Sequence, residues 1–373
     1  MKTWAQNCSC RSKSQNSNFG LSSVGKGAAR IIADAARDRN KRVFGQMAKA
    51  LSEKKGQRML FPVSRNCCWG FIDSSGTVVV PPRYEDVRYF SEGLIGVLDG
   101  GKWGFIDSSG ALAIPNRFET VGEFSEGLAR AGDDKLVGFI DRSGNWVIDR
   151  TFSFAGDFGH GMVDVSDGEK CWFVDRIGMD AFPSRFDAAY GFEEGLALVA
   201  IGERWGYVDP RGNMRVPTDY EGASACFREG LAWIVVGGLF GYISSAGEIT
   251  VPPRYSHAGD FRGGLAAVYQ GDLCGFIDRA GRFVIEPRFS YRPDKQSSKS
   301  RRPLSCRGFS EGLACVYSEG RYGYIDPRGR WVVPPQFDAA GDFTFGLAHA
   351  RIGAKAMWIN HSGFPVWFNE FEG

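Results

Sequence analysis

The chain has 373 residues, 43% of them hydrophobic and 24% charged, with a formal net charge of +2. This composition is globular and provides enough apolar residues for a sizeable core. No window approaches the ~18 consecutive apolar residues that a membrane-spanning helix needs, so we expect no transmembrane segment.

The charge is divided unevenly along the chain. Residues 1–58 hold 13 Lys and Arg against 3 Asp and Glu, or +10, whereas residues 59–373 hold 32 against 40, or −8. Residues 1–25 are polar, rich in Ser and Asn, and have no apolar stretch of signal-peptide length. We predict a disordered N-terminus and a cytoplasmic protein. The lack of acidic residues before Asp34 is also compatible with a transit peptide.

Residues 26–58 form the second predicted segment. Its apolar residues keep a roughly helical spacing among many Lys and Arg, which predicts a basic amphipathic helical segment. An anionic partner is one role for such a segment, and a membrane surface or a nucleic acid is another. Docking on the acidic remainder of the chain is the third, and we do not expect nucleic acid. The apolar positions are Ala28, Ile31, Ile32, Ala35, Val43, Phe44, Met47 and Leu51.

From residue 59 to 373 the sequence is dominated by a repeat. A phrase close to Trp-Gly-Phe-Ile-Asp-x-x-Gly returns nearly every 34 residues. A fixed period of this size is the signature of a repeat architecture, so we predict one repeat domain over 59–373. The copies start at Trp69, Trp103, Val137, Cys171, Trp205, Phe240, Cys274 and Tyr322, with a degenerate ninth at Ala356.

The copy at 93–126 shows the elements of one repeat. Three short runs at 93–98, 102–107 and 111–114 are bounded by turn residues, which predicts three strands. The Asp-x-x-Gly connection suits a tight turn, because Asp can accept from backbone N–H groups and Gly can adopt a positive φ. The Gly after the first aromatic indicates a close approach by another backbone or a ring. Proline after the third run is predicted to end its pairing.

These positions are structural rather than catalytic, since an acidic catalytic group would not need eight copies. In the fourth copy Trp172 replaces the recurrent Gly, so we expect different packing there. The clearest structural positions are Trp69, Gly70, Asp73, Gly76, Trp103, Gly104, Asp107, Gly110, Trp205, Gly206, Asp209, Gly212, Tyr322, Gly323, Asp326 and Gly329.

Two further aromatic positions recur, and Phe, Tyr and Trp interchange at several sites, so size and apolarity are selected. Ordering ~34 residues costs about 1–2 kcal/mol each, and five or six buried side chains return only about 1.5–3 kcal/mol each. One copy cannot fold alone, so neighbouring copies must bury each other's faces. One series runs Tyr84, Phe118, Phe152, Phe186, Tyr220, Tyr255, Phe289 and Phe337, and the other Phe90, Phe124, Phe158, Phe192, Phe227, Phe261, Phe309 and Phe343.

The predicted fold is therefore an all-β, propeller-like ring of about eight small three-stranded blades. An open β-solenoid has the same ingredients and is the alternative. Met59–Val63 resembles a lone first strand, and the ninth copy resembles leftover closing strands.

The phrases WGFIDSSG at 69–76 and 103–110, WGYVDPRG at 205–212 and FSEGL at 90–94 resemble those of the WG-repeat family, also called KWG repeats. The resemblance covers about residues 59–367. It implies a mostly bacterial protein whose repeats are non-catalytic interaction modules without a shared ligand, and it brings no catalytic residues.

Departures from the repeat are the better functional leads. An insertion at 290–308 lengthens one step from 34 to 48 residues, which adds 14. It is either a basic loop that binds an anionic partner or a solvated surface insertion. Its candidate binding residues are Arg292, Lys295, Lys299, Arg301, Arg302 and Arg307.

A partial arginine series precedes the first aromatic series. It offers a rim of donors for carboxylates or phosphates, or local ion pairs with the recurrent glutamates, and we favour the ion pairs. The arginines are Arg83, Arg117, Arg185, Arg254 and Arg288, and the glutamates are Glu92, Glu126, Glu194, Glu229 and Glu311.

Nothing in the sequence predicts an enzyme, a cofactor or a metal site. The nine cysteines lack the spacing of zinc ligands and of a disulfide framework, and the four histidines share no motif. We expect a non-catalytic scaffold that binds a protein or peptide through one face or rim. A carbohydrate or cell-envelope binder is the alternative, followed by an enzyme whose site forms between repeats.

Overall fold

The computed structural model describes residues 59–65, 67–133, 135–290 and 308–368, and these residues form only strands, turns and bends. Their contacts divide them into two compact units. The first comprises the described residues up to 133 and Asp141–Asn145, and the second comprises Lys135–Ile140 and the residues from Trp146 onward. The predicted segments 1–25 and 26–58 lie outside the described residues.

The first unit contains two antiparallel sheets, with orders β1-β2-β3 and β4-β5-β6-β7, and the hairpin β8–β9. Their bounds are β1 (Phe61–Arg65), β2 (Cys68–Ile72), β3 (Val78–Tyr84), β4 (Asp86–Ser91), β5 (Leu94–Asp99), β6 (Lys102–Asp107), β7 (Leu112–Phe118), β8 (Thr120–Ser125) and β9 (Leu128–Gly132).

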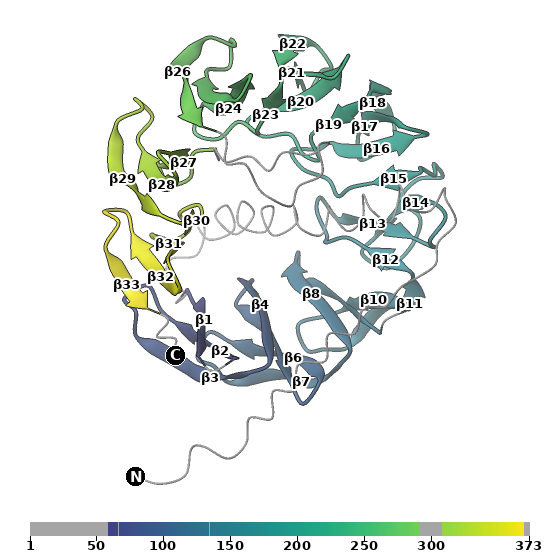
Figure 1. Cartoon of the computed structure of the whole chain (residues 1–373). Helices are drawn as coiled ribbons and strands as arrows, with labels where there is room; N and C mark the ends of the chain where they lie inside the picture. Colours follow the sequence, from purple (N-terminus) through teal and green to yellow (C-terminus); the bar gives the residue numbers. More distant parts are fainter. Residues whose placement is uncertain (1–58, 66, 134, 291–307, 369–373) are drawn as a thin grey trace, which may run out of the picture. The chain divides into compact units, whose positions relative to one another are not determined.

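The second unit begins with the hairpin β10–β11 and continues through six antiparallel sheets, which follow one another along an arc in chain order (Figure 1). The sheets group as β12–β14, β15–β18, β19–β22, β23–β26, β27–β29 and β30–β33. The bounds are β10 (Val137–Ile140), β11 (Trp146–Phe152), β12 (Phe154–Ala155), β13 (Met162–Ser166), β14 (Cys171–Asp175), β15 (Ala188–Ala189), β16 (Ala197–Ile201), β17 (Arg204–Val208), β18 (Met214–Tyr220), β19 (Gly222–Ala223), β20 (Leu231–Val236), β21 (Leu239–Ser244), β22 (Ile249–Tyr255), β23 (His257–Ala258), β24 (Ala266–Gln270), β25 (Leu273–Ile277), β26 (Phe283–Ser290), β27 (Ala314–Ser318), β28 (Arg321–Ile325), β29 (Trp331–Phe337), β30 (Ala339–Ala340), β31 (Leu347–Ile352), β32 (Lys355–Asn360) and β33 (Pro365–Phe368).

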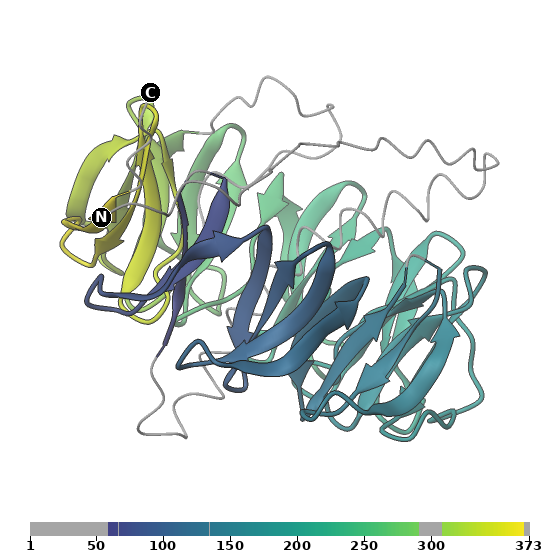
Figure 2. The ribbon, with the colours of Figure 1, turned by 90° about the horizontal axis from the view of Figure 1, so that it is seen from below.

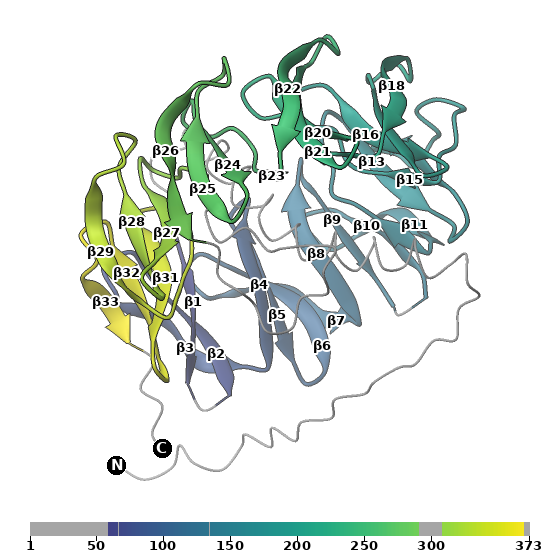
Figure 3. The same ribbon diagram turned by 45° about the horizontal axis from the view of Figure 1, so that its top comes forward.

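Each sheet is a small meander in which consecutive strands pair antiparallel, and Figure 2 shows the twist of these strands. In the β23–β26 sheet the short β23 lies at one edge and β26 at the other (Figure 3). Small twisted meanders in chain order are the blades of a propeller-like fold. The predicted all-β, propeller-like repeat is confirmed.

The blades differ from the prediction in strand number. Six of the nine described sheets have four strands rather than three. The additional first strand has two residues in the sheets that begin with β15, β19, β23 and β30, and six residues in those that begin with β4 and β8. A two-residue strand carries too little periodicity to be recognised in sequence. The ninth copy was expected to supply leftover strands. It instead supplies β32 and β33 to a four-stranded sheet of its own.

The recurrent glycine and the proline of the following strand together allow a bulge in that strand. The third run does not end at its proline: β7 continues through Pro115 to Phe118. Trp103 pairs with Phe118 and Phe105 with Ile114, so the outer strand carries extra residues opposite Gly104. A Cβ at Gly104 would come within 2.6 Å of the Ile114 carbonyl oxygen. The glycine admits this bulge, and the proline lies where no ladder donor is needed.

The fourth copy confirms the expected difference. Trp172 stands where the other copies have this glycine, and the sheet β12–β14 has only three strands. The outer strand is replaced by two isolated bridges, Cys171 with Phe186 and Val174 with Asp180.

Neighbouring copies share their cores, as the entropy argument requires. One buried cluster joins Tyr242 and Val251 of the β19–β22 sheet with Phe261 and Val268 of the next copy. The Tyr242 and Phe261 rings meet edge to face with centroids 4.8 Å apart. The same pair recurs, with centroids 4.7–5.1 Å apart, as Phe105–Phe124, Phe139–Phe158, Phe173–Phe192, Tyr207–Phe227, Phe276–Phe309 and Tyr324–Phe343.

Candidate functional site on the turn face

Two kinds of turn lie at the same end of each meander, and together they form what we call the turn face. One is the Asp-x-x-Gly turn between the last two strands. The other is a Glu–Gly turn, which directly precedes the next long strand, as Glu92–Gly93 precedes β5 and Glu229–Gly230 precedes β20. Ion pairs connect the two kinds of turn in both units, from Arg142 to Glu92 at 3.6 Å and from His361 to Glu311 at 2.9 Å.

The Asp-x-x-Gly turns are capped by their own aspartate. Asp326 Oδ1 accepts from the backbone N–H groups of Arg328 at 3.0 Å and Arg330 at 2.9 Å. The backbone N–H and guanidinium of Arg330 hold the pKa of Asp326 below its usual range. Ser244 caps its turn more loosely, at 3.3 and 3.2 Å. The structural role predicted for the aspartates agrees with these contacts.

The Glu–Gly turns are tight two-residue connections with positive φ at both central residues. In Arg228–Leu231, the N–H of Arg228 donates to the Leu231 carbonyl oxygen at 2.9 Å. Glu229 has φ 54° and Gly230 has φ 75°. A non-glycine residue in this region leaves its backbone N–H exposed beside that of the glycine, and two such N–H groups make a concave anion-binding nest. Other copies have Glu92, Glu126, His160, Glu194, Glu311 and Phe345 at the first position, with φ between 48° and 55°.

The glutamate of one turn binds the nest of the next turn. Glu194 accepts from the N–H groups of Glu229 at 2.9 Å and Gly230 at 2.8 Å, one on each carboxylate oxygen. Glu229 in turn accepts from Gly263 at 2.6 Å and Gly264 at 3.0 Å. The turns are thus linked head to tail by a repeated carboxylate bridge. Single bonds of this kind join Glu92 to Gly127 and Glu311 to Gly346.

This bridge was missed from the sequence, which favoured ion pairs between the glutamates and the arginine series. Arg254 donates instead to the Gly281 carbonyl oxygen of the next Asp-x-x-Gly turn at 2.6 Å. Arg117 and Arg288 make the equivalent bond to Gly144 and Gly329. The sequence signal for this bridge was the constant spacing of the FSEGL phrase. Its glutamate recurs once per repeat, so the glutamate of one copy can reach the turn of the next copy.

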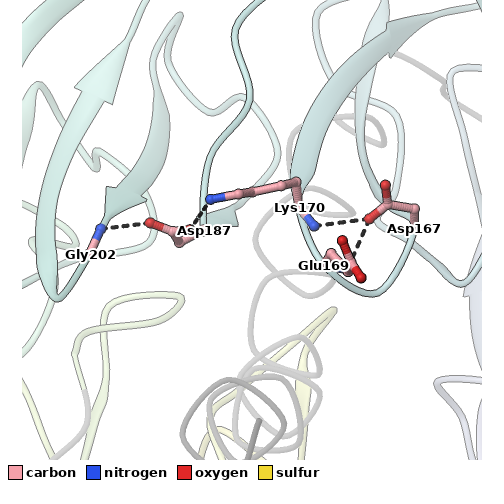
Figure 4. Close-up of polar contacts among 5 residues, drawn as sticks. All are labelled: Asp167, Glu169, Lys170, Asp187 and Gly202. Carbon is pink, nitrogen blue, oxygen red and sulfur yellow. Dashed lines mark hydrogen bonds and ion pairs between the residues drawn. The ribbon is translucent and has the colours of Figure 1, made fainter. Parts of the chain in front are cut away.

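The opposite end of the meanders carries a second network, which we call the hairpin rim. Lys170 follows the turn between β13 and β14 and donates to Asp187 Oδ1, while Asp187 Oδ2 accepts from the Gly202 N–H of the next hairpin at 2.6 Å (Figure 4). Lys170 lowers the pKa of Asp187. Arg321, Asp338 and Gly353 repeat this arrangement. The hairpin rim is therefore a structural connection between blades.

A partly buried ion pair lies between two blades of the second unit. Arg228 approaches Glu193 at 3.3 Å, and both side chains are less than one fifth exposed. Nearby, Ser224 donates to Asp260 at 2.8 Å. These groups pair with one another, although the buried Arg228 Nε has no hydrogen-bond partner in the part of the chain that the structure describes. The described residues contain no group of three or more His, Cys, Asp or Glu able to hold a metal ion.

In each of the two units the outer strands carry exposed apolar side chains at one recurrent position, and we call this set of positions the outer-strand row. Leu112 is 56% exposed, Ile249 55% and Trp331 40%. Each is at the start of its strand, before the bulge. The Trp331 ring also meets the buried Phe289 ring of the preceding copy edge to face, with centroids 5.8 Å apart. Val78, Trp146 and Met214 take the same position in other copies.

The structure places the predicted repeat positions in the strand, bulge and turn roles described above. The six basic candidates of the insertion, from Arg292 to Arg307, lie outside the described residues, and only the flanking Ser290 and Gly308 are described. The described residues contain no helix that is long and apolar enough to cross a bilayer.

Comparisons with solved structures find the same fold at low identity. A structure titled as the eukaryotic initiation factor is 12% identical, covers 84% of this chain and 96% of its own, and has a TM-score of 0.58. Apo AztD from Citrobacter koseri is 13% identical over 85% and 95%, with a TM-score of 0.42. BamB from Moraxella catarrhalis is 9% identical over 86% and 94%, with a TM-score of 0.35. Only the first likeness bears on the fold.

No curated protein matches the sequence. The family model for the WG-containing repeat matches eight segments: 69–103, 103–135, 138–171, 173–205, 205–240, 240–274, 275–291 and 322–355. These segments cover most of the chain and coincide with the copies that start at the recurrent aromatic. By the sequence phrase, by the bulged glycine strand and by this match, the chain belongs to the WG-containing repeat family.

Proposed function

We propose that this chain is a non-catalytic scaffold that binds a protein or peptide through the outer strands of its blades. The observation that carries the proposal is the outer-strand row. Exposed apolar side chains recur at one position in several copies, and Leu112 and Ile249 keep more than half of their surface outside the core. Exposed apolar surface is typical of protein interaction sites, and outer strands also have edges that can pair with an extended peptide.

The recurrent polar residues support a scaffold rather than an enzyme. The aspartates cap their own turns, the glutamates bind the next turn and the partly buried Arg228 pairs with Glu193. Catalysis needs unlike groups that converge on a reacting atom, and these groups are committed to holding the blades together. A carbohydrate ligand is the second candidate, since the row includes Trp146 and Trp331, whose faces could stack on a sugar.

The test compares affinity capture by the full chain with capture by a triple variant, Leu112→Thr, Ile249→Thr and Trp331→Thr. Threonine suits an exposed strand, so the variant is expected to fold. Ile177→Thr is the matched control, because Ile177 is 72% exposed but lies in a turn. We expect one protein to be retained by the wild type and the control and lost by the triple variant. Equal retention by all three, or binding of polysaccharide without any protein, would contradict the proposal.

A further inference from the structure

The Glu–Gly turns are carboxylate receptors that this protein fills with its own side chains. Three described turns of the second unit accept a carboxylate from the preceding turn: those at Glu229–Gly230, Gly263–Gly264 and Phe345–Gly346. In the first two, each oxygen takes one backbone N–H. The receptor is made by the backbone conformation and does not depend on its own side chains, since it works for Glu, Gly and Phe alike.

Two turns of the same unit have the receptor but no carboxylate from the preceding copy. Before Glu194–Gly195 the equivalent residue is His160, and before Glu311–Gly312 it is Gly263. Their φ values, 48° and 82° in one turn and 50° and 79° in the other, match those of the occupied turns. Among the described residues, no acceptor bonds the N–H groups of these two turns. Both glycines face open space, with no atom within 4 Å of an added Cβ.

The chain that leads into the Glu311–Gly312 turn contacts an arginine of the preceding copy. Arg262 lies against Gly308, where a Cβ would come within 3.1 Å of the Arg262 Cδ. Its counterpart in the preceding copy, Arg228, pairs with Glu193, but Arg262 has no ion pair among the described residues. An arginine that is half-buried, has no carboxylate partner among the described residues and contacts Gly308, three residues before this turn, is suited to an incoming anion.

We propose that the Glu311–Gly312 turn and Arg262 form a binding site for a carboxylate side chain of an acidic protein segment, with the Glu194–Gly195 turn as a second such site. Carboxylate is the ligand because the same backbone pair holds a carboxylate in the neighbouring copies, with one oxygen on each N–H. Both sites lie on the turn face, so this goes beyond the apolar outer-strand row, and either proposal can fail without the other.

The chain itself provides the blocking variant. Gly263→Glu restores the glutamate that other copies have at this position, and its carboxylate should fill the Glu311–Gly312 nest. The residue fits: Gly263 has φ 63°, close to the glutamates of the other copies, and an added Cβ would meet only Phe309 at 3.6 Å. Gln270→Glu is the matched control, because it adds the same charge to the same sheet at its opposite end.

The probe is a dye-labelled deca-glutamate peptide, and binding to the full-length chain is followed by fluorescence anisotropy at about 0.3 M salt, which screens exposed charges. The basic residues 1–58 attract this probe equally in every variant, so the difference between variants is the measurement. We expect Gly263→Glu to weaken binding about tenfold and Gln270→Glu to change it less than twofold. Arg262→Gln should weaken it several-fold and serves as the second variant if Gly263→Glu unfolds.

Equal affinity for the wild type, Gly263→Glu and Arg262→Gln would overturn the proposal. So would failure of the wild type to bind the probe at all. Binding of a phosphoserine peptide in place of the glutamate peptide would overturn the assignment of carboxylate. Thermal unfolding of each variant, with midpoints within a few degrees of the wild type, establishes that affinity differences arise in the folded protein.

Discussion

The sheets β12–β14 and β19–β22 come from copies of the same repeat, yet only the second has a full outer strand. Both keep the aromatic pair to the next copy, Phe173–Phe192 in one and Tyr242–Phe261 in the other. Among other differences in the phrase, they differ at its second position, where Trp172 stands in the first and Gly241 in the second. Sharing a core with a neighbour is therefore independent of the outer strand. The bulged outer strand accompanies the glycine, whereas the ninth copy, with Met357 at this position, has a shorter outer strand, β33, without a bulge at Met357.

The largest expected loss of stability concerns the aromatic pair with the next copy, which both sheets have. Phe261→Ala removes a fully buried ring from the Tyr242 contact, and Phe192→Ala does the same at Phe173. Each should cost about 3–5 kcal/mol of unfolding free energy, because a large cavity is left between two blades. Urea unfolding measures both. A loss at Phe192 far smaller than at Phe261 would show that the fourth copy does not share its core in the same way.

The next effect concerns the part in which they differ. Gly241→Ala places a Cβ 2.5 Å from the Val251 carbonyl oxygen, so the outer strand must move. We expect a loss of about 1–3 kcal/mol, the usual cost of overpacking. Trp172→Phe, at the equivalent position of the copy without this outer strand, should cost less than about 1.5 kcal/mol as a size-similar apolar change.

Hydrogen exchange locates the damage. In Gly241→Ala, protection should fall first at the amides of β22, while those of β20 are affected less. Uniform loss of protection across the sheet, or no loss at all, would contradict the view that the glycine serves the outer strand specifically.

The sequence predicted the fold because each repeat position has one dominant physical role. Gly104 marks a backbone approach, Asp107 caps a turn and Phe124 fills the core, and repetition makes each role visible. The fold features that it missed were short or bent. A two-residue strand such as β19 has no periodicity to detect. A strand that passes through Pro115 contradicts local propensity, and only the bulge opposite Gly104 explains it.

The candidate sites were much less predictable. Glu229 was read as an ion-pair partner of an arginine, because charge is visible in sequence and backbone N–H groups are not. The nest in these turns depends on the backbone conformation of two successive residues. The residue type at the first position does not specify it, since Glu, His, Phe and Gly all occur there. The Glu194–Gly195 and Glu311–Gly312 turns receive no glutamate because His160 and Gly263 stand at the glutamate position of the preceding copies. Sequence alone could not identify these turns, because the bridging role of the glutamate was not known.

The smallest expected effect concerns a turn in which β19–β22 is the exception. Ser244→Asp would give its turn the cap that Asp175 supplies in β12–β14, in place of the longer Ser244 contacts. Backbone and arginine donors lower the pKa of Asp278 and Asp326 in equivalent turns. A folded-state pKa below the unfolded value, about 3.8, gives a stabilisation that is present above that pH and is lost as the pH falls through the folded pKa.

We therefore expect Ser244→Asp to raise the unfolding free energy, measured by urea unfolding at pH 7. The gain should be smaller than the loss in either of the two predictions above, and it should shrink toward zero near pH 3. Ser244→Asn is the matched control, because Asn360 caps the last turn with the same geometry and carries no charge. Its effect should be the same at both pH values. A gain for Ser244→Asp that persists at pH 3 would mean that the shape of the cap, and not its charge, distinguishes the two sheets at this turn.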